Sequence, residues 1–427
     1  MNGRRRLRSF RIRYHRLLTV GLLAVAVAVT MIVGAFSGPT ETAQETETAS
    51  SKNSSSEREA PAVAETSAAE EMRGVWVPMM SLQMEKPGEE AFQKKFDNII
   101  QVAQGKGMNA LIVHVRPYGD ALYPSEYFPW SHIVSGTQGV DPGFDPLAYM
   151  VEATHQAGME FHAWVNPLRI QSGDAPSILS QDNPYHQWKG DEAKKGWTVK
   201  TDSGIYYNPA YEGVRSYIAE GVAEIVRNYD VDGVQFDDYF YPTQDASFDK
   251  AAYEAYTATS KKAGDAVLPL EDWRKANINA LVSLVYQKIK AENPEVVFGI
   301  SPQGNLSNDE KMGADVATWC AAKGYLDYIC PQMYVNFEND ALPFTSTLET
   351  WKSLIQEDSI ELYVGLAVYK AGSDVDDGTW KNADDILARQ VSAGRELDCS
   401  GFLFYSWDYL DTQQTQAEME NVMKVLG

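Results

Sequence analysis

The chain has 427 residues, which is enough for one large domain with appendages. Its formal net charge is −22, and its first sixteen residues hold seven arginines and no acid, so the rest of the chain carries −22 − 7 = −29. Because so acidic a body repels phosphate backbones, we expect no nucleic acid among its partners.

The N-terminal region has the pattern of a membrane segment. A basic stretch, residues 1–16, precedes Leu17–Phe36, which are twenty residues without a charge. This run is long enough to cross a bilayer as a helix and longer than the usual apolar core of a cleaved signal. Arginines favour the cytoplasmic side, so we expect a single anchor in the cell membrane with the body outside. The small residues Val33–Ala35 leave cleavage, and hence secretion, open as the alternative.

Residues 37–71 are rich in Ser, Thr, Ala and Glu. Such a composition cannot bury enough apolar surface to fold, which predicts a disordered tether. The remaining residues, 72–427, are expected to form one catalytic body.

In this body, short β-like runs alternate with amphipathic helical stretches. We expect strands at Arg73–Val77, Ala110–Val115, Glu160–Val165, Gly233–Tyr239, Val297–Pro302, Leu326–Tyr334, Glu361–Tyr369 and Gly401–Trp407. We expect helices near residues 89–106, 146–157, 211–228, 271–292, 312–323, 345–356, 382–396 and 413–426. Eight such units predict an α/β fold, a (β/α)8 TIM barrel. A doubly wound open sheet is the alternative, but the glycine-rich phosphate loop that usually follows its first strand is missing.

Two connections are longer than ordinary loops: residues 167–210 after the third strand and 240–270 after the fourth. Both leave from carboxyl ends of strands, so both are expected to wall the mouth of the barrel. The first contains four aromatic residues, Trp188, Trp197, Tyr206 and Tyr207. These rings are suited either to stacking on sugars or to forming a small core under the loop.

The carboxyl ends of barrel strands supply binding and catalytic residues. Here they are rich in carboxylates, amides, arginines and aromatic rings, which suit hydrogen bonding to paired hydroxyls and stacking on sugar faces. We therefore expect a polysaccharide or glycan strand to be bound by Arg116, Asp120, His162, Asn166, Arg169, Tyr239, Gln332, Tyr334 and Trp407.

No Ser–His nucleophile elbow, phosphate loop or set of residues at metal-ligand spacing is recognisable in the sequence. We therefore expect neither a metal nor a cofactor. His162 is expected to donate a hydrogen bond to the substrate or to a neighbouring group. The three cysteines, Cys320, Cys330 and Cys399, are widely spaced and are expected to be buried, idle thiols.

Asp237 and Asp238 are the most informative pair in the chain. An Asp pair is common on solvated loops, but this one ends an apolar strand, where carboxylates are expensive to place. Side chains alternate along a strand, so Gln235 and Asp237 should face the interior while Val234 and Phe236 face the helices. We expect Asp237 to be the nucleophile or charge stabiliser, and Asp238 either the second carboxyl or an orienting group. The other candidates for the general acid are Glu338 and Asp408.

With its residues arranged in this way, the chain resembles glycosyl-hydrolase-like family ten, a family of bacterial barrels. The matching stretches are Arg73–Trp76, Val115–Ala121, Pro129–Ser131, His162–Arg169, Asp232–Pro242, Ile300–Pro302 and Pro331–Tyr334. The resemblance implies a carbohydrate-active enzyme of the cell envelope, with peptidoglycan glycan strands as a substrate of some members.

Two better-known barrel types resemble the chain only in part. The segment 233–237 is similar to the fourth strand of amylase-type barrels, but the glutamate acid that those enzymes carry on the fifth strand is absent after Ile300. In chitinase-type barrels, the acid glutamate would fall on Tyr239. The leading hypothesis is a membrane-tethered glycoside hydrolase, and a non-catalytic glycan-binding barrel is the alternative. A deacetylase or esterase would need a metal set or a Ser–His pair.

Overall fold

The computed structural model describes residues 71–427. The predicted basic segment, the membrane segment and all of the tether except Glu71 lie outside these residues. Within 71–427, no helix combines the length and the apolar character that crossing a bilayer requires.

Eight parallel strands close into a barrel in the order β1-β11-β10-β9-β8-β7-β3-β2. Their bounds are β1 Met72–Val77, β2 Ala110–Arg116, β3 Glu160–Val165, β7 Gly233–Phe236, β8 Val297–Ile300, β9 Tyr328–Ile329, β10 Glu361–Ala367 and β11 Gly401–Tyr405. The predicted barrel is confirmed. Strand β9 is shorter than expected because Pro331 has no N–H to give to a ladder, although Gln332 still bridges Gln303 and Gly365 beyond it.

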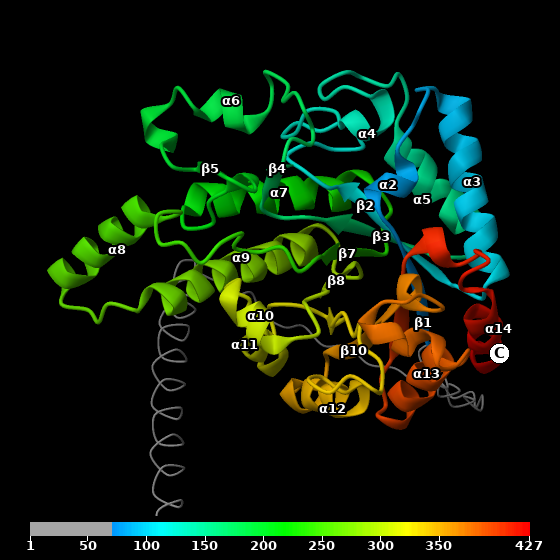
Figure 1. Ribbon diagram of the computed structural model, residues 1–427. Coiled ribbons are helices and arrows are strands. Elements are labelled where there is room, and N and C mark those ends of the chain that lie inside the picture. Colours follow the sequence, from blue (N-terminus) through cyan, green and yellow to red (C-terminus); the bar gives the residue numbers. More distant parts are fainter. Residues whose placement is uncertain (1–70) are drawn as a thin grey trace, which may run out of the picture. The chain divides into compact units, whose positions relative to one another are not determined.

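Helices surround this barrel (Figure 1). Those near the predicted positions are α3 Glu89–Gly105, α5 Pro146–Gln156, α7 Glu212–Asn228, α9 Leu270–Glu292, α12 Phe344–Leu354, α13 Ile386–Glu396 and α14 Gln416–Leu426. The predicted helix at 312–323 is replaced by two short ones, α10 Leu306–Lys311 and α11 Val316–Ala321. They are separated by a turn in which Gly313 has a φ of +74°.

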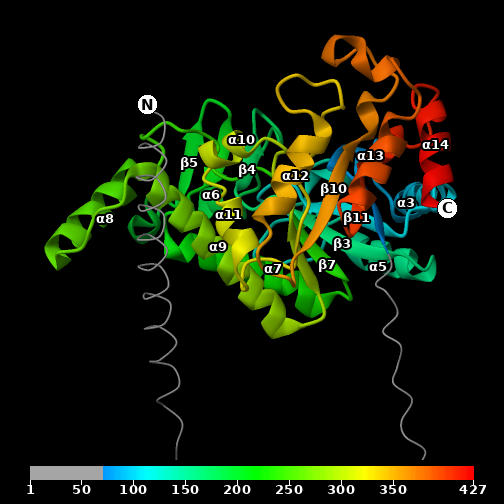
Figure 2. The same cartoon turned by 90° about the horizontal axis from the view of Figure 1, so that it is seen from below.

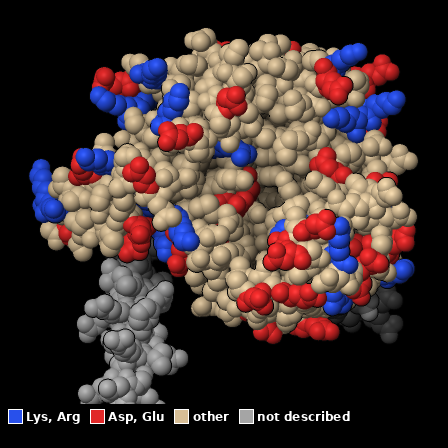
Figure 3. Space-filling view, in the orientation of Figure 1, with Lys and Arg blue, Asp and Glu red and all other residues tan. Residues whose placement is uncertain are grey.

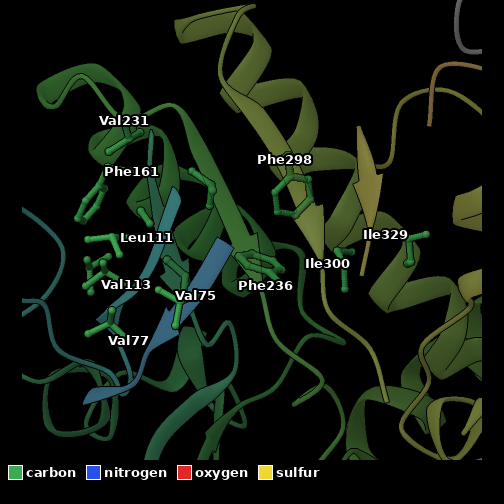
Figure 4. Close-up of a cluster of buried hydrophobic side chains, with 14 of the residues drawn as sticks. Val75, Val77, Leu111, Val113, Phe161, Val231, Phe236, Phe298, Ile300 and Ile329 are labelled. Atoms are coloured by element: carbon green, nitrogen blue, oxygen red, sulfur yellow. The ribbon is translucent and has the colours of Figure 1, made fainter. Parts of the chain in front are cut away.

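The barrel strands have one hydrophobic layer on their outer face, against the helices, and another on their inner face. One set of alternating side chains, including Val75, Val113, Phe236 and Phe298, packs against the helices (Figure 4). The opposite set fills the barrel and contains Trp76, Ile112, Trp164, Tyr328, Cys330 and Leu403. Val234 and Phe236 lie in the outer layer, as predicted. All three cysteines are buried and free.

The long connection after β3 folds into a small antiparallel sheet of order β4-β6-β5. Its strands are β4 Arg169–Ser172, β5 Thr198–Thr201 and β6 Gly204–Tyr207, with the short helix α6 Pro184–Trp188 between the first two. Trp188 is 5% exposed, and its ring centroid lies 5.1 Å from that of Trp197 and 5.7 Å from that of Tyr207. The aromatic residues of this connection therefore pack under it and join the main hydrophobic core, rather than forming an open surface on which sugars stack.

The connection after β7 carries helix α8 (Lys250–Ala263), which extends away from the barrel (Figures 1 and 2). A buried ion pair fixes its base. Arg274 of α9 donates from Nε and Nη2 to the two carboxylate oxygens of Asp249, at 2.8 and 2.7 Å. Bidentate pairing of this kind compensates for the loss of water around both charges.

Candidate active site

One face of the body is hollowed, with acidic atoms in its depth and a basic group beside it (Figure 3). Strands β2, β3, β7, β8 and β9 direct their carboxyl ends toward one end of the barrel, where parallel strands collect functional side chains. The interactions at this end join side chains from five successive barrel strands.

Asp237 follows the last residue of β7 and is 3% exposed. Trp164 donates from Nε1 to its Oδ2 (3.0 Å), and Asn166 donates from Nδ2 to both oxygens (3.1 Å each). Burial raises the pKa of Asp237 to about 7, against the opposing effects of Arg169 and of these donors. A carboxyl group with a pKa near neutrality is suited to proton transfer.

Asp238 points toward residues that follow the next two strands. Gln332 donates from Nε2 to its Oδ1 (3.0 Å), and Gln303 donates from Nε2 to its Oδ2 (3.1 Å). Each oxygen therefore accepts one amide N–H, which fixes the orientation of the carboxyl group. The two adjacent aspartates have different partners on different strands.

Arg169 forms the cationic wall of this end of the barrel. It is the first residue of β4, and its guanidinium lies between two tyrosine rings, 5.1 Å from the centroid of Tyr118 and 5.0 Å from that of Tyr239. Its Nε donates to Pro117 O (3.0 Å), while its own backbone N–H donates to Asn166 Oδ1 (2.9 Å). The second bond fixes which side of the Asn166 amide faces Asp237. Tyr239 is 52% exposed, so one face of this wall is open.

His114 is a site residue that the sequence analysis missed. Its ring stacks on Trp164 at a centroid distance of 3.8 Å and an interplanar angle of 7°. Burial, and then Arg169, hold the pKa of His114 well below its usual value, so the imidazole is neutral at neutral pH. Its alternation with inward-facing Ile112 on β2 was the signal that would have found it.

Beneath these groups, the barrel interior is hydrogen-bonded. Trp76 donates from Nε1 to Gln235 Oε1 (2.6 Å), and Gln235 donates from Nε2 to the hydroxyl of Tyr328 (3.2 Å). All three side chains are at most 3% exposed. The interior position predicted for Gln235 is confirmed. The hydrogen bonds that Gln235 makes to Trp76 and Tyr328 lie in the barrel interior below Asp237.

Of the predicted site residues, the structure brings seven together: Asn166, Arg169, Asp237, Asp238, Tyr239, Gln332 and Tyr334. Tyr334 belongs to this group because its ring lies 5.8 Å from that of Tyr405, and because Asp238 contributes to raising its pKa, after burial.

Two other predicted residues lie elsewhere. Arg116 comes after an irregularity in the β2–β3 register, so its side chain turns outward, where its guanidinium lies 4.5 Å from the centroid of Phe128 and beside helix α7. His162 faces the interior but sits near the amino end of β3, where its Nε2 lies 3.1 Å from Glu160 Oε2. Their predicted contact with substrate at the carboxyl end is wrong.

The remaining candidates surround the site without joining its hydrogen bonds in the described part of the chain. Asp120 is fully buried and accepts from Gln138 Nε2 (2.9 Å), which braces the loop after β2. Trp407 packs against the main core. Glu338 accepts from Asn382 Nδ2 (2.9 Å), and Asp408 accepts from Ser81 Oγ (2.7 Å). Neither acid is paired with Asp237 or Asp238.

Residues 71–382 match the model of a protein family described as glycosyl hydrolase-like 10. The chain belongs to this family. It is similar to glycosyl hydrolase YngK of Bacillus subtilis, with 34% identity over 79% of this chain and 68% of the relative. It is also similar to glycosyl hydrolase DigH of Escherichia coli O6:H1, with 31% identity over 83% of this chain and 87% of the relative.

Solved structures share the architecture of this glycosyl hydrolase-like 10 barrel. The glycoside hydrolase domain of PgaB (BpsB) from Bordetella bronchiseptica has a TM-score of 0.55 at 15% identity, over 83% of this chain and 99% of that domain. An endo-1,4-β-mannanase from Rhizomucor miehei has a TM-score of 0.52 at 7% identity, over 83% of this chain and 94% of the mannanase. At such identities the likeness shows the fold alone.

In this glycosyl hydrolase-like 10 chain, the chemistry available at the carboxyl end is that of two buried carboxyl groups, one cation, amides and tyrosines. Among residues 71–427, no group of three or more His, Cys, Asp and Glu side chains is arranged to hold a metal ion. Asp237 can exchange a proton near neutral pH, while Asp238 is held in place as an acceptor.

Proposed function

We propose that this barrel hydrolyses glycosidic bonds of a cell-envelope glycan outside the cytoplasmic membrane, with peptidoglycan glycan strands as the substrate. The observation that carries the proposal is the pair Asp237 and Asp238, two buried carboxyl groups in different environments at the carboxyl end of the fourth barrel strand. Glycoside hydrolysis needs two carboxyl groups with separate roles. The family and its relatives named glycosyl hydrolases support the same reaction class.

The environments of the two groups suggest a division of labour. From the sequence alone, Asp237 was expected to be the nucleophile or charge stabiliser. The raised pKa of Asp237, caused by burial, suits it better to give a proton to the leaving oxygen. Asp238, which accepts one amide N–H on each oxygen, is then the carboxylate that attacks or that offsets the positive charge on the sugar ring.

A non-catalytic glycan-binding barrel is the second candidate, and one observation favours it. The fifth barrel strand, β8, continues into Ser301-Pro302-Gln303 and carries no acid there, while Glu338 is engaged by Asn382. In this case the tyrosines and amides at the carboxyl end would bind sugar without cleaving it.

Incubation of the protein with purified glycan strands, with and without their peptides, separates the two candidates. Hydrolysis releases new reducing ends, which disappear in the Asp237→Asn and Asp238→Asn variants while glycan binding persists. Binding by the wild-type protein without new reducing ends would establish the binding module instead. Fractionation tests the location: we expect the protein in the membrane fraction, whereas recovery from the medium with an N-terminus near Phe36 would show a cleaved signal.

A further inference from the structure

A chain of hydrogen bonds reaches Asp238 from helix α10. Lys311 lies with its Nζ 3.5 Å from Asn308 Oδ1, Asn308 donates from Nδ2 to Gln303 Oε1 (2.9 Å), and Gln303 donates from Nε2 to Asp238 Oδ2 (3.1 Å). Asn308 is partly exposed, and neither its sequence motif nor the proposed reaction gives it a role.

The direction of this chain is determined by its two ends. A lysine ammonium group can only donate, and an ionised carboxylate can only accept. The two amides between them must therefore turn their oxygens toward Lys311 and their N–H groups toward Asp238. Without the hydrogen bond from Asn308 Nδ2 to Gln303 Oε1, the side-chain amide of Gln303 would be free to rotate by half a turn. It would then present Oε1, instead of an N–H, to Asp238.

The same helix also holds the backbone of Gln303. The backbone N–H of Gln303 donates to Asp309 Oδ1 (2.9 Å), and Asp309 is completely buried. Gln332, the second amide on Asp238, is fixed in a comparable way, because its Nε2 also donates to Ser301 O (3.1 Å). Both amides that contact Asp238 are thus oriented by a third group.

We propose that Asn308 is a positioning residue: by orienting the Gln303 amide, it keeps an N–H directed at Asp238 and so holds that carboxylate in place. The consequence for catalysis rests on the proposed function, whereas the hydrogen-bond relation does not. The other titratable groups around Asp238 are Asp237 and Tyr239 on its own segment, Tyr334 after β9 and Asp309 on α10.

The test reverses the direction of the hydrogen bond between residue 308 and Gln303 with a substitution that keeps the side-chain shape. In Asn308→Asp the new carboxylate accepts from Gln303, so the Gln303 amide turns and presents its oxygen to Asp238. The loss of a charge-assisted hydrogen bond should lower kcat by about tenfold or more, with little change in KM, and move the acidic limb of the kcat profile to higher pH. Asn308→Ala, which only frees the amide, should lose less. A merely structural role would make the alanine variant at least as poor as the isosteric aspartate.

Asn293→Asp is the matched control. Asn293 precedes β8 at the opposite end of the barrel, is also partly exposed, and uses its side-chain oxygen to accept from Glu295 N (3.0 Å), a role that aspartate retains. It should behave as the wild type. If Asn308→Asp matches this control in kcat and pH profile, the proposal is overturned.

A measurement without substrate separates this proposal from the proposed function. The infrared carboxylate band of Asp238 is obtained in the full-length protein by subtracting the spectrum of Asp238→Asn. As the pH is lowered, that band should disappear at a higher pH in Asn308→Asp than in the wild type or Asn293→Asp. Identical titrations would refute the positioning role even in an active enzyme. A shifted titration in a protein without hydrolytic activity would retain the positioning role and reject the hydrolase.

Discussion

Asp237 and Asp238 are neighbours in sequence, yet different strands supply their hydrogen bonds. Asp237 is bonded by Trp164 and Asn166 on the β3 side, and Asp238 by Gln303 and Gln332 on the β8 and β9 side. Alternation at the end of a strand thus places two identical side chains in two environments. Sites that need an acid and a base with separated pKa values use this kind of difference.

Asp237→Asn removes the ionisable group and keeps its shape. We expect a loss of about 10³-fold or more in kcat on a natural glycan, because general acid catalysis is lost. The loss should be much smaller on an aryl glycoside whose leaving group needs no proton, whereas Asp238→Asn should lose activity on both substrates. Steady-state rates on the two substrates check this assignment, and equal losses in both variants would argue against it.

Arg169→Gln should move the alkaline limb of kcat/KM upward. Arg169 lowers the pKa of Asp237, which burial holds at about 7, so removal of the guanidinium lets that pKa rise further. An acid with a higher pKa stays protonated to a higher pH, so the variant should keep its activity to a higher pH than the wild type. Arg389→Gln removes the same charge from the exposed face of α13 and should leave the pH profile unchanged.

Alternation predicted which strand residues face the interior, and it succeeded for Gln235, Val234 and Phe236. Arg116 was expected at the site only from its place at the end of a strand, and an irregularity between His114 and Arg116 changes the face that its side chain occupies. Sequence carries little trace of a local register shift of this kind. His162 was expected at the carboxyl end of its strand but lies near the amino end, because period-two alternation contains no information on height within the barrel.

Gly299 of β8 lies close to the ring of Tyr328 on the neighbouring strand β9. A Cβ at Gly299 would lie 2.0 Å from the ring of Tyr328, which is 2% exposed and accepts from Gln235. Gly299→Ala should therefore lower the free energy of unfolding by about 2 kcal/mol, because the ring has no free volume into which to move. Gly105→Ala, at the end of α3 with nothing within 4 Å of the new Cβ, should raise it by about 0.5 kcal/mol. Urea titration of both variants checks the contrast.

Element positions were mostly predictable because each helix and strand carries its own period. The two long connections were recognised by their length, and a satellite core was one of the two interpretations of the first. The short helices α10 and α11 were not resolved from the sequence, since six residues give too few turns to establish a helical period. That segment supplies Asn308 and Asp309, so the support of Asp238 was missed with it.

At the scale of the whole molecule, buried acids should make stability depend on pH. Burial raises the pKa of Asp237 to about 7, of Glu418 to about 7 and of Asp309 to about 8. A carboxyl group whose pKa is higher in the folded state binds its proton more tightly there. Its contribution to the free energy of unfolding is therefore complete below pH 4 and is lost as the pH rises through 7 to 8. Thermal unfolding should show Tm falling between pH 5 and pH 8.

Asp309→Asn isolates one of these groups. Its side-chain oxygen still accepts from Gln303 N, but the ionisation is removed. The variant should match the wild type at pH 5, exceed it by at least about 1 kcal/mol at pH 8, and show a shallower fall of Tm with pH. Equal slopes for the two proteins would mean that Asp309 does not titrate in this range.

Arg169 belongs both to the small β4-β6-β5 sheet, as the first residue of β4, and to the site, where its positive charge lowers the pKa of Asp237. Any displacement of that outlying sheet moves a positive charge relative to the carboxyl group at the barrel end. The acidity of the site is therefore adjustable from a distance. Substitutions in this insertion are therefore a route to change the pKa of Asp237 while the strands and both aspartates stay the same.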